Sequence, residues 1–148
     1  MAQMTYRDAL RKALHDAMTE DEDVFVIGEE VGRYGGAYGV TKGLIDEFGP
    51  ERLRDTPISE PAIVGTAVGA AMAGMRPVAE LMYVDFIGMT MDQLCNQAAK
   101  IRYMFGGQGR VPMVMRMPIG IWSSSAAQHS QSLEAWFAHI PGLVVVAP

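Results

Sequence analysis

The sequence predicts an α/β fold in which a mostly parallel sheet is covered by helices on both faces. Short apolar runs without polar alternation, such as residues 24–27, are typical of strands buried on both faces. Stretches with helical spacing separate these runs, and parallel strands need crossovers of that kind. The chain has 148 residues, enough for one domain with its own core. We therefore expect one open α/β unit whose functional side chains gather at the carboxyl ends of the strands.

Each element is predicted from a local signal. Tyr6, Leu10 and Leu14 fall on one helical stripe, and Thr5 is a natural N-cap for that first helix. Ser59 and Pro61 are typical of a helix start. The expected helices lie at 6–17, 41–49, 61–75, 89–105 and 132–140. The expected strands lie at 24–27, 78–84, 111–116 and 143–146, with a weak extended segment at 52–56.

Two further patterns concern assembly and extent. Gly65, Gly69 and Ala73 recur every four residues along the helix at 61–75, and such a ridge of small residues lets another backbone approach closely. We expect this helix to be buried on several sides and to lie at a subunit contact. The sequence stops after the strand at 143–146, where the alternating pattern calls for another helix, so we expect a truncated domain.

Composition excludes several classes of protein. Twelve Lys and Arg against 17 Asp and Glu give a formal net charge of −5, which argues against a nucleic-acid binder. The single Cys95 excludes an internal disulfide framework and a multi-thiolate zinc site, and fits a reducing cytoplasm. The least polar stretch, 61–75, is shorter than a membrane span, and the charged N-terminus lacks the apolar core of a signal peptide. We expect a cytoplasmic protein without a membrane partner.

Common catalytic motifs are absent. The sequence has no G-x-S-x-G, no Walker A motif and no H-E-x-x-H, which argues against serine hydrolases, P-loop NTPases and zincins. The glycines at 28–36 lack dinucleotide-binding spacing and do not open a helix directly. His15, His129 and His139 have no metal-ligand spacing to one another or to Cys95.

Three residues stand where an open α/β fold builds its crevice. Glu60 precedes a helix, Phe86 follows the strand at 78–84, and His129 follows the strand at 111–116. Each also has an ordinary structural explanation. Glu60 in a first turn interacts favourably with the helix dipole, Phe86 is an ordinary core residue, and a histidine in a polar loop is usually solvated.

Several segments together resemble one family. They are T-Y-R-D-A at 5–9, G-E-E-V at 28–31, G-A-Y at 36–38, D-T-P-I-S-E at 55–60, the small-residue stretch 68–74 with R-P at 76–77, N-Q-A-A-K at 96–100 and A-Q-H-S-Q-S at 127–132. The chain resembles, over nearly its whole length, the beta subunit of the thiamine-diphosphate-dependent decarboxylating component of 2-oxo acid dehydrogenase complexes. That family acts on pyruvate, branched-chain 2-oxo acids or acetoin.

The resemblance implies a transketolase-like pyrimidine-binding domain over residues 1–148, incomplete at its carboxyl end and without the family's C-terminal transketolase domain. It also implies thiamine diphosphate as cofactor. Glu60 matches the carboxylate that shares a proton with the aminopyrimidine ring and so promotes the imino tautomer that acts as a base. Phe86 matches the aromatic residue packed on that ring. Ile58 and Met82 are its expected apolar neighbours.

Three other positions acquire expected roles from the resemblance. His129 matches an active-centre histidine that orients or protonates the intermediate and meets the incoming lipoyl group. Glu29 matches an acidic residue lining a polar passage between paired active sites, and a purely structural role is an equal alternative. The backbone carbonyl of Met113 aligns with a potassium ligand of some family members.

The resemblance also implies partners. The family's magnesium ion and diphosphate are held by a Gly-Asp-Gly segment and a downstream Asn, and no Gly-Asp-Gly occurs here. A separate alpha subunit should supply them, in an alpha2beta2 assembly with self-associating beta subunits and a lipoyl-bearing acyltransferase. The favoured hypothesis is a pyruvate dehydrogenase-type subunit, active only with its alpha subunit. An acetoin dehydrogenase beta subunit, a non-catalytic assembly fragment and a transketolase-type or deoxyxylulose-phosphate synthase enzyme remain alternatives.

Overall fold

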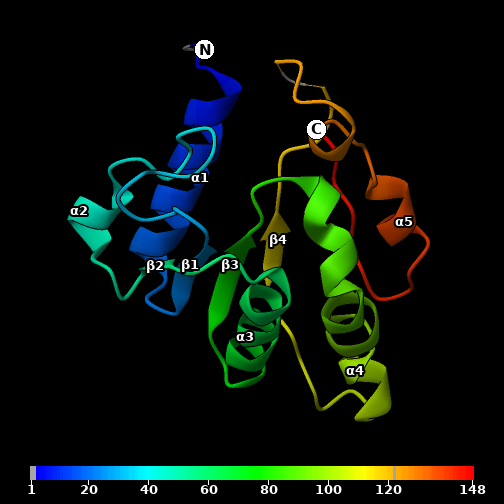
Figure 1. The fold of residues 1–148 in the computed structure, drawn as a ribbon. Coiled ribbons are helices and arrows are strands. Elements are labelled where there is room, and N and C mark those ends of the chain that lie inside the picture. Colours follow the sequence, from blue (N-terminus) through cyan, green and yellow to red (C-terminus); the bar gives the residue numbers. More distant parts are fainter. Residues whose placement is uncertain (1–2, 122) are drawn as a thin grey trace.

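A computed structural model describes residues 3–121 and 123–148 of the chain, and Figure 1 shows its fold. The elements follow the alternation expected from the sequence. In chain order they are α1 Tyr6–Glu20, β1 Val24–Gly28, α2 Leu44–Phe48, β2 Leu53–Asp55, α3 Glu60–Met72, β3 Arg76–Glu80, η1 Val84–Thr90, η2 Asp92–Ala98, α4 Ile101–Met104, β4 Val114–Arg116, η3 Ala127–His129 and α5 Glu134–Ala138. Of these, η1 and η3 are 3₁₀ helices and η2 is a π-helix.

The sheet has the order β2-β1-β3-β4, and each neighbouring pair is parallel. The central strand β1 pairs with β2 through Val26 and Leu53, and with β3 through Val26 and Val78. All of β1 is buried, as its unbroken apolar run predicts. The predicted parallel sheet is confirmed.

Two apolar cores lie on the two faces of the sheet, because side chains alternate along each strand. One core lies against α1 and α2 and contains Leu14, Met18, Val24, Val26, Val31, Val40, Leu44, Leu53 and Val78. The other lies against α3 and the segments after β3 and contains Phe25, Ile27, Ile63, Val64, Ala67, Val68, Ala79, Leu81, Val84, Ile87, Leu94, Cys95, Ile101 and Phe137. Figure 1 shows α1 and α2 on one side of the sheet and α3 and α4 on the other, as predicted.

The first helix starts where the sequence predicts. The Thr5 hydroxyl oxygen accepts a hydrogen bond from the Asp8 backbone N–H at 3.1 Å, which satisfies one of the free donors of the first turn. At the other end of α1, Arg52 donates hydrogen bonds to the backbone oxygens of Met18 and Asp21, both at 2.9 Å. Arg52 also donates to the Val24 oxygen at 2.6 Å, so one side chain ties the end of α1 to the start of β1.

The prediction of a single helix at 89–105 is wrong. The chain instead forms η1, η2 and α4 in succession. The Ala99 N–H bonds to the Leu94 oxygen five residues back, at 2.9 Å, which widens the turn by one residue. Leu94, Cys95 and Ala99 are buried in this segment.

Three strand predictions need correction. The strand expected at 111–116 covers only Val114–Arg116. The strand expected at 78–84 runs instead over Arg76–Glu80, because the chain turns into the 3₁₀ helix η1 after Tyr83. The strand expected at 143–146 does not form. Among the described residues, no backbone hydrogen bond joins 144–148 to a neighbour, and Val144 and Val146 are exposed. Valines favour a strand, but a strand also requires ladder bonds from an adjacent one, and the short β4 does not supply them here.

The small-residue ridge of α3 is not buried on several sides within this chain, contrary to expectation. Gly65 is half-buried, and Gly69 and Ala73 are exposed, although the sheet, η1 and η2 all pack against α3. A contact between this ridge and another chain stays a prediction. No helix within 3–121 and 123–148 is long and apolar enough to cross a membrane.

Candidate active site

The parallel sheet brings the sequence-predicted residues to one edge. Glu29 directly follows β1, Glu60 follows β2 after a short loop, Phe86 lies in η1 after β3, and His129 ends η3 after β4. In Figure 1 the loop that carries η3 lies beyond the tip of β4. Packing of α3 and η3 against η1 places these elements side by side. The candidate residues therefore gather at the carboxyl ends of the strands, as the sequence predicts.

Glu60 is the first residue of α3 and is buried, with 6% of its surface exposed. Pro61 follows it, and its fixed φ suits the first turn of a helix. In the part of the chain that the structure describes, no side chain or backbone N–H donates a hydrogen bond to the Glu60 carboxyl, and no cation pairs with it. A mostly buried carboxyl without a protein partner is open to a hydrogen-bond donor from outside the chain.

Glu29 is a second buried carboxyl at the same edge. Its Oε1 atom is fully buried and has no hydrogen-bond partner among the described residues. Burial raises the pKa of Glu29, and the charge of nearby Glu60 raises it further. Glu29 therefore keeps its proton to a higher pH than an ordinary glutamate does.

Aromatic rings form a cluster among the segments that follow β1, β3 and β4. The rings of Phe86 and His129 lie edge to face with centroids 5.4 Å apart, and Tyr83 lies 4.9 Å from His129 and 6.2 Å from Phe86. Tyr38, from the glycine-rich loop after β1, extends the cluster through an edge contact with Tyr83 at 6.4 Å. Phe86 and His129, 43 positions apart in the sequence, are thus in direct contact. Such a cluster offers an apolar wall with one imidazole in it.

Glu80 and Arg116 form a buried ion pair next to Gly36. The Glu80 carboxylate lies 2.7 Å from a guanidinium nitrogen of Arg116, and only 3% of the Glu80 side chain is exposed. Burial raises the pKa of Glu80, and Arg116 partly opposes this change. Above the pair, Gly36 has φ +78°, and a Cβ there would lie 2.9 Å from a Glu80 carboxylate oxygen. Only glycine fits both the conformation and the space.

Sequence reasoning missed Tyr38, Tyr83, Glu80 and Arg116. Glu80 and Arg116 carried a detectable signal, because opposite charges inside two apolar strand segments need each other when both strands are buried. Tyr38 lies in the G-A-Y segment that was noted without a role. No local pattern distinguishes Tyr83 from a core residue.

The remaining predicted residues are spread more widely. Met82 is half-buried just before Tyr83, whereas Ile58 is 81% exposed on the loop before α3. Met113 is half-buried just before β4, and its N–H bonds to the Val111 oxygen. No group of three or more His, Cys, Asp or Glu side chains within the described ranges could hold a metal ion. The roles predicted for Ile58, Met82 and Met113 stay predictions.

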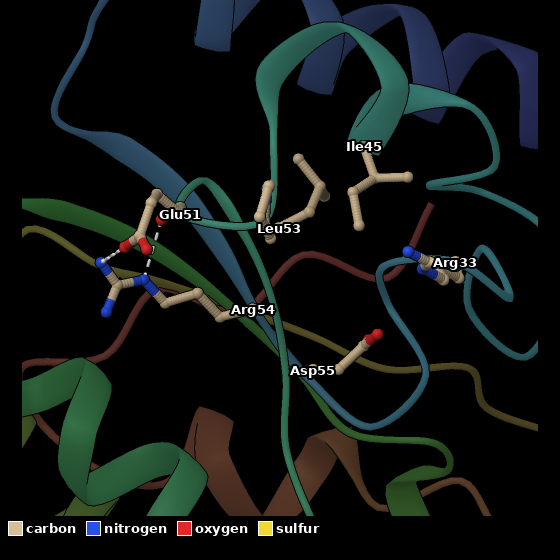
Figure 2. Close-up of a pocket in the computed structure, with 7 residues that line it drawn as sticks. Arg33, Ile45, Glu51, Leu53, Arg54 and Asp55 are labelled. Carbon is tan, nitrogen blue, oxygen red and sulfur yellow. Dashed lines mark hydrogen bonds and ion pairs between the residues drawn. The ribbon is translucent and has the colours of Figure 1, made fainter.

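The surface has two hollows near β2. The first, of about 420 Å³, lies at the edge strand β2 and is lined by Arg33, Ile45, Pro50, Glu51, Leu53, Arg54 and Asp55. Figure 2 shows the Arg54 guanidinium bonded to Glu51, at the opposite side of the hollow from Arg33. The second, of about 300 Å³, is mostly apolar and is lined by Ile27, Thr56, Pro57, Ser59, Ala62, Ile63 and Thr66. Glu60, Phe86 and His129 line neither hollow.

Comparisons with known proteins identify the family. The model of the transketolase pyrimidine-binding domain matches residues 2–148. A protein of Rhizobium meliloti named pyruvate dehydrogenase E1 component subunit beta is 54% identical over 148 residues, which are 100% of this chain and 32% of the relative. A protein of the same name from Rickettsia conorii is 54% identical over 146 residues, 99% of this chain and 45% of the relative. A protein of Arabidopsis thaliana named pyruvate dehydrogenase E1 component subunit beta-1, mitochondrial, is 51% identical over 146 residues, which are 99% of this chain and 40% of the relative.

The chain spans about a third to just under half of the length of these relatives. Over the span that the chain shares with these relatives, half or more of the positions are identical. The fold has the parallel sheet, with helices on both faces, that the sequence predicts. The chain therefore belongs to the family of transketolase pyrimidine-binding domains.

Proposed function

We propose that this chain supplies the aminopyrimidine half of a thiamine diphosphate site in a pyruvate dehydrogenase beta subunit. The observation that carries the proposal is the position of Glu60, a mostly buried residue at the start of α3 whose carboxyl has no hydrogen-bond donor among the described residues. The names of the relatives favour pyruvate over acetoin as the substrate class. The activity expected is oxidative decarboxylation with acyl transfer to lipoyl groups.

The donor set fits the cofactor. A buried, unpartnered carboxyl suits a protonated ring nitrogen, and the apolar rings of Phe86 and Tyr83 suit a flat heterocycle. When bound, thiamine diphosphate supplies a nucleophilic carbon that attacks the carbonyl of a 2-oxo acid. In this proposal the Glu60 carboxyl binds the ring nitrogen and holds the proton there, and its burial keeps water from competing for that hydrogen bond.

Other residues of the chain orient and shield the site. Phe86 packs on the ring face with Met82 and Ile58 as apolar neighbours, and exposed Ile58 suits a position covered by another chain. His129 presents its imidazole beside Phe86 and Tyr83, where it can donate or accept a proton. Glu29, whose pKa is raised by burial and by the charge of Glu60, lines the same edge of the sheet.

The proposal requires partners. An alpha subunit in an alpha2beta2 assembly would hold magnesium and the diphosphate, since the Gly-Asp-Gly segment is not part of this chain. A lipoyl-bearing acyltransferase would accept the acyl group. We keep a potassium ion at the Met113 carbonyl, and a cytoplasmic location, as parts of the same proposal.

The test replaces Glu60 with Gln in the full-length chain assembled with its alpha subunit. We expect pyruvate turnover to fall by about a hundredfold or more, because Gln cannot share the ring proton. Glu22→Gln, an exposed carboxamide control, should leave turnover unchanged. Unchanged turnover in Glu60→Gln would disprove the assigned role.

Calorimetry separates the catalytic proposal from a non-catalytic assembly fragment. Thiamine diphosphate with magnesium should bind to the alpha and beta chains together and should bind far more weakly to either alone. If the assembled chains show no binding heat and no saturation, the chain has only an assembly role.

A further inference from the structure

Asp85 joins the segment after β3 to the loop that carries His129. It lies in η1, directly before Phe86, and is half-buried. Its Oδ1 atom accepts hydrogen bonds from the backbone N–H groups of Ser130 and Gln131, both at 3.2 Å. These two residues directly follow His129. A side chain 45 positions away thus holds the backbone next to the imidazole.

A backbone hydrogen bond from the Gly120 N–H to the Gln131 oxygen, at 2.8 Å, also closes the loop. Its helix η3 is three residues long, and the His129 N–H bonds to the Ala126 oxygen at 3.3 Å. Ser124 and Ala126 have positive φ values of 57° and 62°, a conformation that costs of order 1 kcal/mol or more for a residue with a side chain. Backbone in such a conformation persists only where tertiary contacts hold it. Asp85 supplies two of those contacts.

The residues on either side of Asp85 contact the imidazole itself. Tyr83 lies 4.9 Å and Phe86 5.4 Å from the His129 ring, measured between centroids. The segment 83–86 therefore contacts the His129 ring through two aromatic side chains. Through one carboxylate it also holds the backbone that directly follows His129. No lysine or arginine within the described ranges pairs with Asp85, so its charge is available to strengthen the two hydrogen bonds.

We propose that Asp85 is a positioning residue that fixes the His129 loop so that the imidazole faces the reacting centre. The inference rests on the proposed function, since it assigns His129 a place in that site. Asp85 does not touch the cofactor in this assignment, so it acts on turnover only through His129. Its loss should lower kcat and leave the affinity for thiamine diphosphate, which depends on Glu60 and Phe86, unchanged.

The experiment compares Asp85→Ala and Asp85→Asn in the full-length chain assembled with its alpha subunit. Asn keeps a carbonyl oxygen that can accept both N–H groups, whereas Ala keeps none. Asp46→Ala, an exposed position on α2, is the matched control. The readouts are hydrogen exchange at the Ser130 and Gln131 amides, the dissociation constant for thiamine diphosphate, kcat for pyruvate turnover and the thermal midpoint.

We expect Asp85→Ala to speed exchange at both amides and to lower kcat about tenfold to a hundredfold, the effect of a misplaced catalytic group. The cofactor dissociation constant should change less than threefold, and Asp85→Asn should recover most of the lost kcat. The control should match the unchanged protein in every readout.

Two results would overturn the inference. Unchanged amide exchange in Asp85→Ala would show that the carboxylate does not hold the loop, and this conclusion would not depend on the function of the chain. Faster exchange with unchanged kcat would show that the loop is held but that its position does not matter for turnover. If Glu60→Gln leaves turnover unchanged, the proposed function fails. The exchange data would then still decide whether Asp85 holds the His129 loop.

Discussion

The buried carboxyl of Glu29 is close enough to that of Glu60 for the charge of Glu60 to raise its pKa. The two residues come from different elements, one following β1 and the other starting α3. The Oε1 atom of Glu29 is fully buried and has no hydrogen-bond partner among the residues described. The cost of charging Glu29 should therefore be visible in the pH dependence of the stability of the fold.

Glu29→Gln should stabilise the chain above neutral pH. A raised pKa in the folded state means that protonated Glu29 stabilises the fold fully below its ordinary value of 4.5, and that this stability is lost as pH rises through the folded value. Gln is never charged, so its advantage over Glu29 should be largest near pH 8 and vanish below pH 4.5. Thermal unfolding across this range checks the expectation, with Glu22→Gln as an exposed control.

Arg116→Met should destabilise the chain by about 3–5 kcal/mol at neutral pH, because it leaves the buried Glu80 charge without its cation. Burial already raises the pKa of Glu80, so the loss should shrink as acidification protonates that carboxyl. Adding Glu80→Gln should recover much of the stability. Urea unfolding at several pH values measures this, and exposed Arg33→Met should have little effect. A loss independent of pH would contradict the electrostatic explanation.

Arg52→Ala should cost about 2–3 kcal/mol, since three backbone oxygens lose a charged donor. Arg52→Lys should fall in between, because an ammonium group cannot reproduce the planar fork. The comparison is Arg102→Ala, an exposed substitution that should stay within about 0.5 kcal/mol. Equal midpoints for Arg52→Ala and Arg102→Ala in denaturant would refute the role of Arg52 in joining α1 to β1.

Gly69→Ala and Gly28→Ala should act in opposite directions on the stability of the chain. Gly69 lies inside α3 with open space around its Cβ position, so Ala should add about 0.5–1 kcal/mol of helix stability. A Cβ on Gly28 would lie 2.5 Å from the Glu80 backbone oxygen, so Ala there forces β1 and β3 apart. Calorimetric unfolding of both variants checks the signs.

The same Gly69→Ala variant tests the expected subunit contact of α3. If the ridge packs against another chain, the added methyl group should weaken self-association in sedimentation experiments even though the single chain is more stable. Unchanged association would place the contact elsewhere.

Most of the architecture was predictable because its signals are local. The buried run of β1, the Thr5 cap of α1 and the Pro61 start of α3 each depend on a few adjacent residues, and the structure confirms them. The segment 143–146 shows the limit of this reasoning. Its valines favour a strand, but a strand exists only when a neighbouring strand completes its hydrogen bonds.

The same distinction between local and long-range signals applies to the candidate site. By itself, the sequence determined that Glu60, Phe86 and His129 follow strands of a parallel sheet and so reach one edge, because strand direction and crossovers are written in the hydrophobic pattern. Only the tertiary structure decided that Glu29 and Glu60 are coupled and that Asp85 holds the His129 loop. Charge coupling and desolvation depend on distances between residues far apart in the chain, and no local pattern encodes those distances.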